Sequence, residues 1–94
     1  MNIFKVILTR QVEKDLPKVP LHIVRKLLAW VDDVANAGLS EIRKIPGYHD
    51  EPLKGSRAGQ RSIRLSKAYR AIYAIDQEGK IEIVKVLEVN KHDY

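Results

Sequence analysis

Basic side chains are concentrated in one part of this 94-residue sequence. Seventeen consecutive positions carry six Lys and Arg residues and no Asp or Glu: Lys54, Arg57, Arg61, Arg64, Lys67 and Arg70. The net charge of the whole chain is +5 and this window alone carries +6, so the remaining residues sum to −1. A positive charge this concentrated indicates a surface that binds a polyanion, of which nucleic acid is the most common in cells.

The sequence His92-Asp93-Tyr94 supplies groups that could transfer protons. Imidazole titrates near neutral pH, which makes His92 the first candidate for an acid or a base. In an extended segment the side chains of His92 and Tyr94 emerge on one side and that of Asp93 on the other. We therefore expect His92 and Tyr94 to act together, with Asp93 as an orienting group. The alternative is that these residues form a frayed, unstructured segment.

Composition restricts the class of protein. Hydrophobic residues make up 45% of the chain and charged residues 31%, as in ordinary globular proteins. No apolar run approaches the roughly 20 residues that span a bilayer, and no signal-peptide pattern is present, so we expect one cytoplasmic domain over residues 1–94. Cysteine is absent, the three His residues are far apart, and there is no glycine-rich phosphate loop. We therefore expect no metal site.

Helical periodicity is clearest after Pro20, which suits the first position of a helix. Apolar residues then recur at the 3.6-residue spacing of one helix face: Ile23, Val24, Leu27, Leu28, Val31, Val34 and Ala35. Gly38 is a suitable stop for this helix. A shorter helix is expected to begin at Thr9 and to end at Pro17. Trp30 flanks the apolar stripe, and we expect it to pack rather than to stack on a base.

Four segments have the β-branched and apolar composition of strands: Asn2–Leu8, Gln60–Ser66, Tyr69–Asp76 and Ile81–Val89. The segment 39–54 holds Pro and Gly and is expected to be a surface connection. The resulting order β-α-α-β-β-β predicts an α+β fold, with two helices on one face of a small antiparallel sheet. If Ile63 and Leu65 face the helices, Ser62 and Arg64 line the open face. A cationic open face suits single-stranded RNA or a negatively charged partner.

Three segments together resemble the RelE/ParE superfamily of bacterial toxins, and within it the HigB-like branch: VEKDLPKVP, LKGSRAGQRSIRLSKAYRAIYAI and VLEVNKHDY. They are similar to the first helix of the family, to its central hairpin with an SIR and a YR motif, and to its closing strand and tail. The resemblance implies a RelE-like fold and a toxin of a type II toxin-antitoxin system, which acts without a cofactor and is neutralised by a cognate antitoxin. Many members cut mRNA in the ribosomal A site, whereas ParE-like members poison DNA gyrase and lack the nuclease residues.

RNA can be cut without a metal when its own 2′-OH attacks the neighbouring phosphorus. A base takes the proton of the hydroxyl, cations stabilise the crowded phosphate, and an acid protonates the departing 5′ oxygen. By resemblance, Arg64 of the SIR motif and Arg70 of the YR motif form the phosphate clamp. A guanidinium group suits this task because it donates two parallel hydrogen bonds and keeps its charge. The alternative for both is a solvated surface side chain or an ion pair with Glu82 or Glu88.

Other basic residues are expected around this clamp. Lys54 matches a basic position of the resembling toxins and is a candidate for proton transfer, with an ordinary surface Lys as the alternative. His49 could reach the same cleft. Four residues are expected to bind backbone phosphates of mRNA or ribosomal RNA: Arg57, Arg61, Lys67 and Lys91. The arginine pair and the His-Asp-Tyr tail favour an endoribonuclease over a ParE-like gyrase inhibitor, and both over a plain RNA-binding domain.

Overall fold

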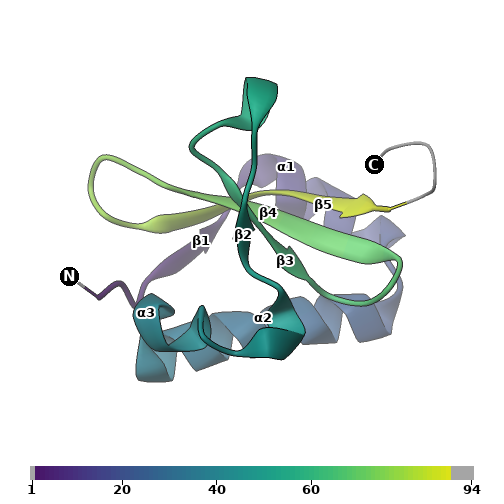
Figure 1. Ribbon diagram of the computed structural model, residues 1–94. Coiled ribbons are helices and arrows are strands. Elements are labelled where there is room, and N and C mark those ends of the chain that lie inside the picture. Colours follow the sequence, from purple (N-terminus) through teal and green to yellow (C-terminus); the bar gives the residue numbers. More distant parts are fainter. Residues whose placement is uncertain (1, 90–94) are drawn as a thin grey trace.

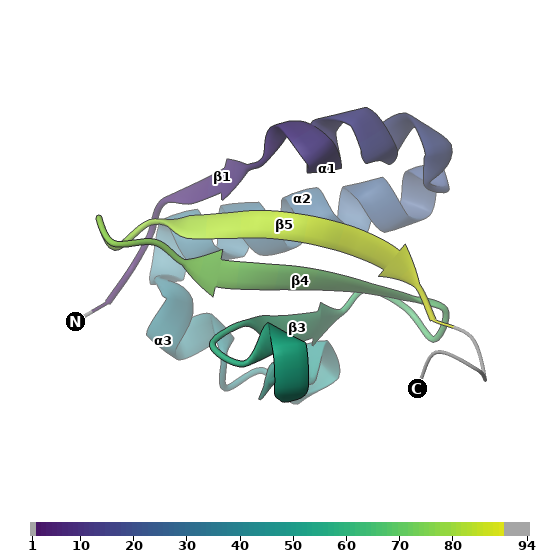
Figure 2. The same cartoon turned by 90° about the horizontal axis from the view of Figure 1, so that it is seen from above.

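The computed structural model describes residues 2–89, and its strands form one five-stranded sheet in the order β1-β5-β4-β3-β2 (Figure 1, Figure 2). In chain order the strands are β1 (Val6–Leu8), β2 (Glu51–Pro52), β3 (Arg61–Arg64), β4 (Tyr69–Ile75) and β5 (Ile81–Glu88). β1 pairs with β5 in parallel, and the other neighbours pair antiparallel. The sheet is therefore mixed, with its two longest strands, β4 and β5, side by side.

Helical segments connect and cover these strands. Within residues 2–89 they are α1 (Arg10–Asp15), α2 (Leu21–Ala37), α3 (Leu39–Ile42) and the 3₁₀ turns η1 (Leu16–Lys18), η2 (Pro46–Tyr48) and η3 (Gly55–Arg57). Figure 2 shows α2 behind the strands and α1 beside β5. Thr9 caps α1, because its hydroxyl accepts a hydrogen bond from the backbone N–H of Val12 at 3.4 Å. None of the helices in residues 2–89 has the length and apolar character that crossing a bilayer requires.

The predicted α+β fold is confirmed, with a difference in the direction of one strand. The sequence predicts an antiparallel sheet, whereas β1 runs parallel to β5, with Val6 opposite Ile81 and Leu8 opposite Ile83. Apolar alternation indicates that a segment is a strand, but not its direction beside a partner far along the chain. The segment 39–54, predicted to be an irregular connection, contains α3, η2 and β2.

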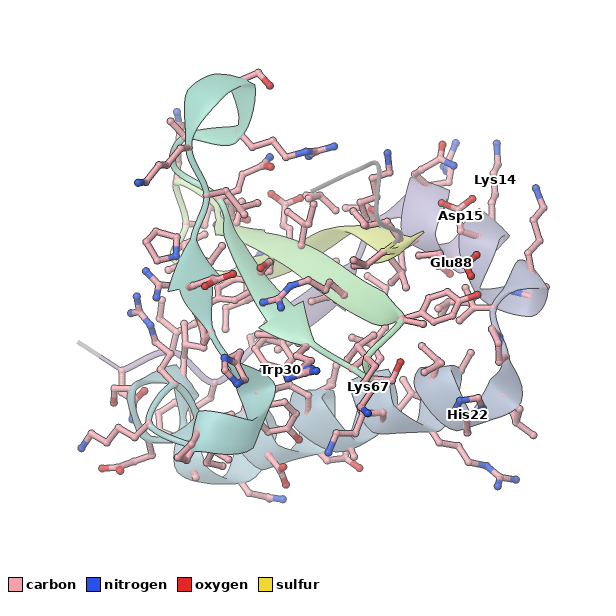
Figure 3. All side chains as sticks on the ribbon, turned by 45° about the vertical axis from the view of Figure 1, so that its right-hand side comes forward. Lys14, Asp15, His22, Trp30, Lys67 and Glu88 are labelled. Atoms are coloured by element: carbon pink, nitrogen blue, oxygen red, sulfur yellow. The ribbon has the colours of Figure 1, made fainter. Side chains whose placement is uncertain are left out.

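The core forms where α2 packs on the sheet. The residues that α2 buries are spaced by four, three and four positions, which keeps them on one helix face: Ile23, Leu27, Trp30 and Val34. Trp30 is 0% exposed, and its ring centroid lies 5.4 Å from that of Tyr73 in β4 (Figure 3). The prediction that Trp30 flanks the apolar stripe is wrong, and Leu28, predicted to lie within the stripe, is 44% exposed. The helical angle from Leu27 to Trp30 is smaller than that to Leu28, so Trp30 occupies the core face.

The junction between α2 and α3 is tied to the N-terminal segment. Gly38 ends α2 with φ 87° and ψ 151°, a conformation that is essentially restricted to glycine. The backbone N–H of Leu39 donates to the carbonyl of Ile3 at 2.7 Å, and the side-chain oxygen of Asn2 accepts from the N–H of Ser40 at 2.9 Å. The path of the chain into β1 therefore depends on the shape of this glycine turn.

We expect Gly38→Ala to lower the free energy of unfolding by at least about 2 kcal/mol, since a side chain here is strained by its positive φ. In addition, a Cβ at this position would collide with the side-chain amide of Asn2. Urea denaturation followed by far-UV circular dichroism measures the loss. Gly47→Ala is the matched control, because its φ is not positive and a Cβ there meets nothing within 4 Å. Equal stability of the two variants would contradict this account of the junction.

Candidate functional site

The pairing of β3 with β4 places two arginine residues directly opposite each other. Arg64 and Arg70 are direct Cα partners in this antiparallel pair. Directly opposite residues project from the same face of a sheet, with Cβ atoms about 4.5–5.5 Å apart, and like charges in this arrangement are destabilising. Ile63 and Leu65 are buried, so the predicted alternation of β3 is correct and Arg64 lies on the face away from α2. This open face therefore concentrates positive charge in a way that favours an anion.

A shallow pocket of about 280 Å³ lies at this end of the β3–β4 pair. Its lining residues are Arg64, Ser66, Lys67, Arg70 and Val89. Figure 3 shows Lys67 on the loop that follows β3, where the chain turns into β4. Three of the lining residues are cationic and, within the part of the chain that the structure describes, none is acidic. The pocket thus combines concave shape with a positive potential.

The guanidinium group of Arg70 is held along one edge. Its Nε donates to the hydroxyl of Ser62 at 3.0 Å, and its Nη2 donates to the backbone carbonyl of His49 at 2.9 Å. Nη2 also lies 3.6 Å from a carboxylate oxygen of Glu51. The Arg70 side chain is 13% exposed, and Ser62 beneath it is 1% exposed. Nη1 has no hydrogen-bond partner among residues 2–89, so its N–H donors are not used by the described residues.

Arg64 is half-buried and has neither a hydrogen-bond nor an ion-pair partner among residues 2–89. The alternative expectation, an ion pair of Arg64 or Arg70 with Glu82 or Glu88, is not realised in this part of the chain, since the acidic partner of Arg70 is Glu51. Figure 3 shows Glu88 on the side of the sheet where α1 lies. The Arg64 side chain therefore lines the pocket with its charge unopposed by described residues.

Arg61 lies on the other side of the sheet. It is opposite Tyr73, which contacts Trp30, so it shares the face that α2 covers. Its Nε donates to a carboxylate oxygen of Asp50 at 2.6 Å, and the hydroxyl of Tyr73 donates to the other oxygen at 2.6 Å. The predicted contact of Arg61 with an RNA phosphate stays a prediction, but Arg61 does not share the face of Arg64 and Arg70.

Burial and hydrogen bonding explain the electrostatics of this cluster. The Asp50 side chain is 1% exposed. Burial raises the pKa of the Tyr73 hydroxyl, and its hydrogen bond to Asp50 raises it further. Burial alone lowers the pKa of Arg61, but the hydrogen bond and charge of Asp50 outweigh that effect, so the pKa is raised. The cluster therefore consists of the ion pair between Arg61 and Asp50 and the neutral hydroxyl of Tyr73, which donates a hydrogen bond to Asp50.

Lys54 and Arg57 belong to the connection between β2 and β3. This connection includes η3 and projects from the sheet in teal in Figure 1. It enters β3 at Arg61, whereas the pocket lies beyond Arg64, and a strand of four residues separates its ends by roughly 10 Å. Nη1 of Arg57 donates to the side-chain oxygen of Gln60 at 2.9 Å. The structure therefore does not bring Lys54 and Arg57 into the pocket.

The predicted tail residues lie outside the described residues: Lys91, His92, Asp93 and Tyr94. The last described residue, Val89, lines the pocket, and its backbone N–H donates to the carbonyl of Ala68 at 2.6 Å. The chain therefore leaves the described region at the pocket rim.

Sequence reasoning missed the residues that hold the arginines. Ser62 was expected on the open face, but its role as an acceptor for Arg70 was not predicted. Asp50 and the His49 carbonyl were also missed, because they meet β3 and β4 only after the chain folds. The one available signal was the acidic pair Asp50-Glu51, two residues away from the start of the basic window.

Arg61→Ala is expected to lower the free energy of unfolding by about 3–5 kcal/mol, because it leaves the buried Asp50 carboxylate without its cation. Thermal and urea denaturation both measure this change. Arg57→Ala is the matched control, because its side chain pairs with the neutral Gln60 and its loss is expected to cost about 1 kcal/mol or less. A stable Arg61→Ala variant would show that Asp50 does not require its charged partner.

Comparison with known proteins agrees with this architecture. Residues 6–92 match the family described as the ParE toxin of the type II toxin-antitoxin system parDE. A chain of the toxin-antitoxin complex RelBE2 from Mycobacterium tuberculosis is 25% identical, with a TM-score of 0.67, and the match covers 93% of this chain and 99% of that one. The comparison with curated proteins found no match.

Two further solved structures share the fold. The archaeal RelE–RelB complex from Pyrococcus horikoshii contains a chain that is 23% identical, with a TM-score of 0.69 over 97% of this chain and 99% of that chain. YafQ from E. coli is 19% identical, with a TM-score of 0.71 over 89% of this chain and 91% of that chain. Because the family match extends over nearly the whole sequence, this protein belongs to the ParE toxin family, within the RelE/ParE superfamily of toxins of type II toxin-antitoxin systems.

Proposed function

We propose that this toxin is an endoribonuclease that cleaves mRNA on the ribosome, without a metal ion, through attack by the 2′-OH of the RNA. The observation that carries the proposal is the pair Arg64 and Arg70, which face each other across β3 and β4 and line one pocket with Lys67. Such a cross-strand pair opposes folding unless an anion lies between the two groups. A phosphodiester supplies that anion, and its charge increases as the transition state forms.

The arginines bind the scissile phosphate in this proposal. Arg70 presents its Nη1 end while Ser62 and the His49 carbonyl hold the opposite edge, so little reorganisation is needed on binding. Arg64 donates from the other strand, and Lys67 adds a third cation at the rim. Donors fixed around a developing oxyanion are typically worth 10²–10³-fold in rate each. The phosphate site therefore accounts for much of the expected rate enhancement.

Proton transfer falls to the tail residues His92 and Tyr94 in this proposal. In the sequence, His92 and Tyr94 follow Val89, which lines the pocket, by three and five positions. One of these side chains takes the proton of the 2′-OH as the bond between the 2′ oxygen and phosphorus forms. The other gives a proton to the 5′ oxygen as its bond to phosphorus breaks. The products are a 2′,3′-cyclic phosphate and a 5′-OH end.

The remaining cations bind the flanking RNA. Lys54 and Arg57 lie before the start of β3 and outside the residues that line the pocket, which suits contact with a neighbouring phosphate. We assign Lys91 to the same task, because it follows Val89 by two residues. Phosphate contacts of this kind give affinity that falls with rising salt concentration. Placement on a ribosome would supply the single-stranded mRNA that such a surface needs.

A cognate antitoxin is the proposed protein partner. The similar structure from Mycobacterium tuberculosis is a toxin-antitoxin complex, and that from Pyrococcus horikoshii is a complex of RelE with RelB. On this chain the cationic open face favours an antitoxin segment with acidic side chains, which would cover the pocket and exclude RNA. Neutralisation by occupation of the pocket requires no change in the fold of the toxin.

A second candidate function is inhibition of DNA gyrase, which the description of the matched family as ParE favours. The two functions differ in their cellular products. Sequencing of 5′ ends in cells that express the protein is expected to reveal new 5′-OH ends inside translated messages. Intact mRNA together with induced DNA damage would instead support gyrase inhibition. Intact mRNA with undamaged DNA would leave only a binding function.

We expect Arg64→Ala to lower the rate of mRNA cleavage in a reconstituted translation reaction by at least about 10²-fold. Arg64→Lys keeps the charge but loses the two parallel donors, so its rate should lie between wild type and alanine. Arg25→Ala on the exposed face of α2 is the matched control and should cleave like wild type. If all variants arrest growth and cleave RNA equally, Arg64 does not belong to the site.

His92→Ala is expected to lower kcat by roughly 10²–10⁴-fold with little change in KM, because general acid–base catalysis acts on the chemical step. Tyr94→Phe removes the hydroxyl that transfers the other proton and should change the alkaline side of the pH–rate profile. Single-turnover cleavage across pH 5–10 measures both effects. An unchanged profile in both variants would exclude the tail from proton transfer.

A further inference from the structure

One short segment contacts both faces of the sheet. The Asp50 side chain enters the helix-covered face, where its two carboxylate oxygens accept from Arg61 and Tyr73, each at 2.6 Å. The carbonyl of the preceding residue, His49, accepts from Nη2 of Arg70 on the open face at 2.9 Å. The backbone at residues 49–50 therefore links the buried charge cluster to the arginine of the candidate site.

The conformation of His49 makes this double contact possible. His49 has φ 44° and ψ 51°, the left-handed region that non-glycine residues adopt infrequently. Such a conformation persists when neighbouring contacts fix it. Here Tyr48 on one side is 5% exposed and donates its hydroxyl to Asp33 of α2 at 3.1 Å. On the other side Asp50 is held by its side chain and by a 3.3 Å hydrogen bond from Nη2 of Arg61 to its backbone carbonyl.

We propose that Asp50 is a positioning residue for Arg70, acting through the carbonyl of His49. The buried bonds of Asp50 fix the backbone of the left-handed turn, and the turn fixes the His49 carbonyl. That carbonyl and the Ser62 hydroxyl occupy the Nε and Nη2 edge of Arg70, which leaves its Nη1 end directed to a ligand. Arg61 and Tyr73 take part as the partners that keep Asp50 in place.

Asp50→Asn is the variant that tests this chain of contacts. The amide oxygen can still accept, but the amide nitrogen donates, so the side chain cannot accept from both Arg61 and Tyr73 as before. Tyr73→Phe is a milder second variant, since it removes one hydrogen bond and keeps the buried ring beside Trp30. Asp76→Asn is the matched control, because that carboxylate accepts from backbone N–H groups in the hairpin that follows β4, away from Arg70.

The first measurement is the side-chain Nε–Hε NMR signal of Arg70 in the full chain, which does not depend on any activity. A held guanidinium group gives a resolved signal with slow hydrogen exchange. We expect exchange of this proton to accelerate at least tenfold in Asp50→Asn and less in Tyr73→Phe, with no change in Asp76→Asn. If exchange at Arg70 is unchanged in a folded Asp50→Asn or Tyr73→Phe protein, Asp50 does not position Arg70.

The second measurement rests on the proposed nuclease function. In the reconstituted cleavage reaction Asp50→Asn should lower kcat about 10- to 100-fold, the effect of a slightly misplaced catalytic group, while KM changes less than kcat. Combined with Arg70→Ala it should cause less than a twofold further loss, because both changes act through one group. Additive losses would overturn the proposal. If the wild type cleaves no RNA, the nuclease function fails, and the NMR measurement alone still decides the role of Asp50.

Discussion

The register between β3 and β4 determines which charges of this protein meet. Ile63 lies opposite Ala71, and both are fully buried, so a slip of one residue would turn Ile63 to the open face and Arg64 toward α2. Burial of an Ile side chain contributes about 1.5–3 kcal/mol, which exceeds the roughly 0.2–1 kcal/mol that a cross-strand charge pair involves. Hydrophobic burial therefore enforces the proximity of Arg64 and Arg70 against their mutual repulsion.

The same alternation explains why the basic window does not form one continuous patch. Arg61 precedes Ile63 by two positions and so projects toward the helices, where a cation without a partner would be strongly destabilising. Asp50 supplies the partner, and Tyr73 supplies the remaining hydrogen bond. Two cations of the window therefore differ in role. Arg61 stabilises the fold through its ion pair with the buried Asp50. Arg64 has no ion-pair partner among the described residues and keeps its charge available for a ligand.

The sequence was sufficient for those features that depend on local pattern. The order of the longer helices and strands follows from periodicity, the split between Ile63 and Arg64 follows from strand alternation, and the SIR and YR motifs led to the toxin superfamily. Contacts between distant segments were not accessible in this way. Three contacts join segments that come together only in the folded chain. They are the parallel pairing of β1 with β5, the ion pair of Asp50 with Arg61, and the hydrogen bond from Arg70 to the carbonyl of His49. The HigB-like assignment and the roles of residues 91–94 stay predictions.

The pairing of β1 with β5 affects how the protein can fold during its synthesis. During translation β1 is synthesised first and β5 after the other strands. Val6 therefore has no strand to pair with until Ile81 has been synthesised and has left the exit tunnel of the ribosome. Val89, which walls the pocket, is added later still. Long-range pairing of this kind delays assembly until most of the chain is available. The five-stranded sheet therefore closes only after the segment that contains β5 is available, and the pocket wall at Val89 forms after that.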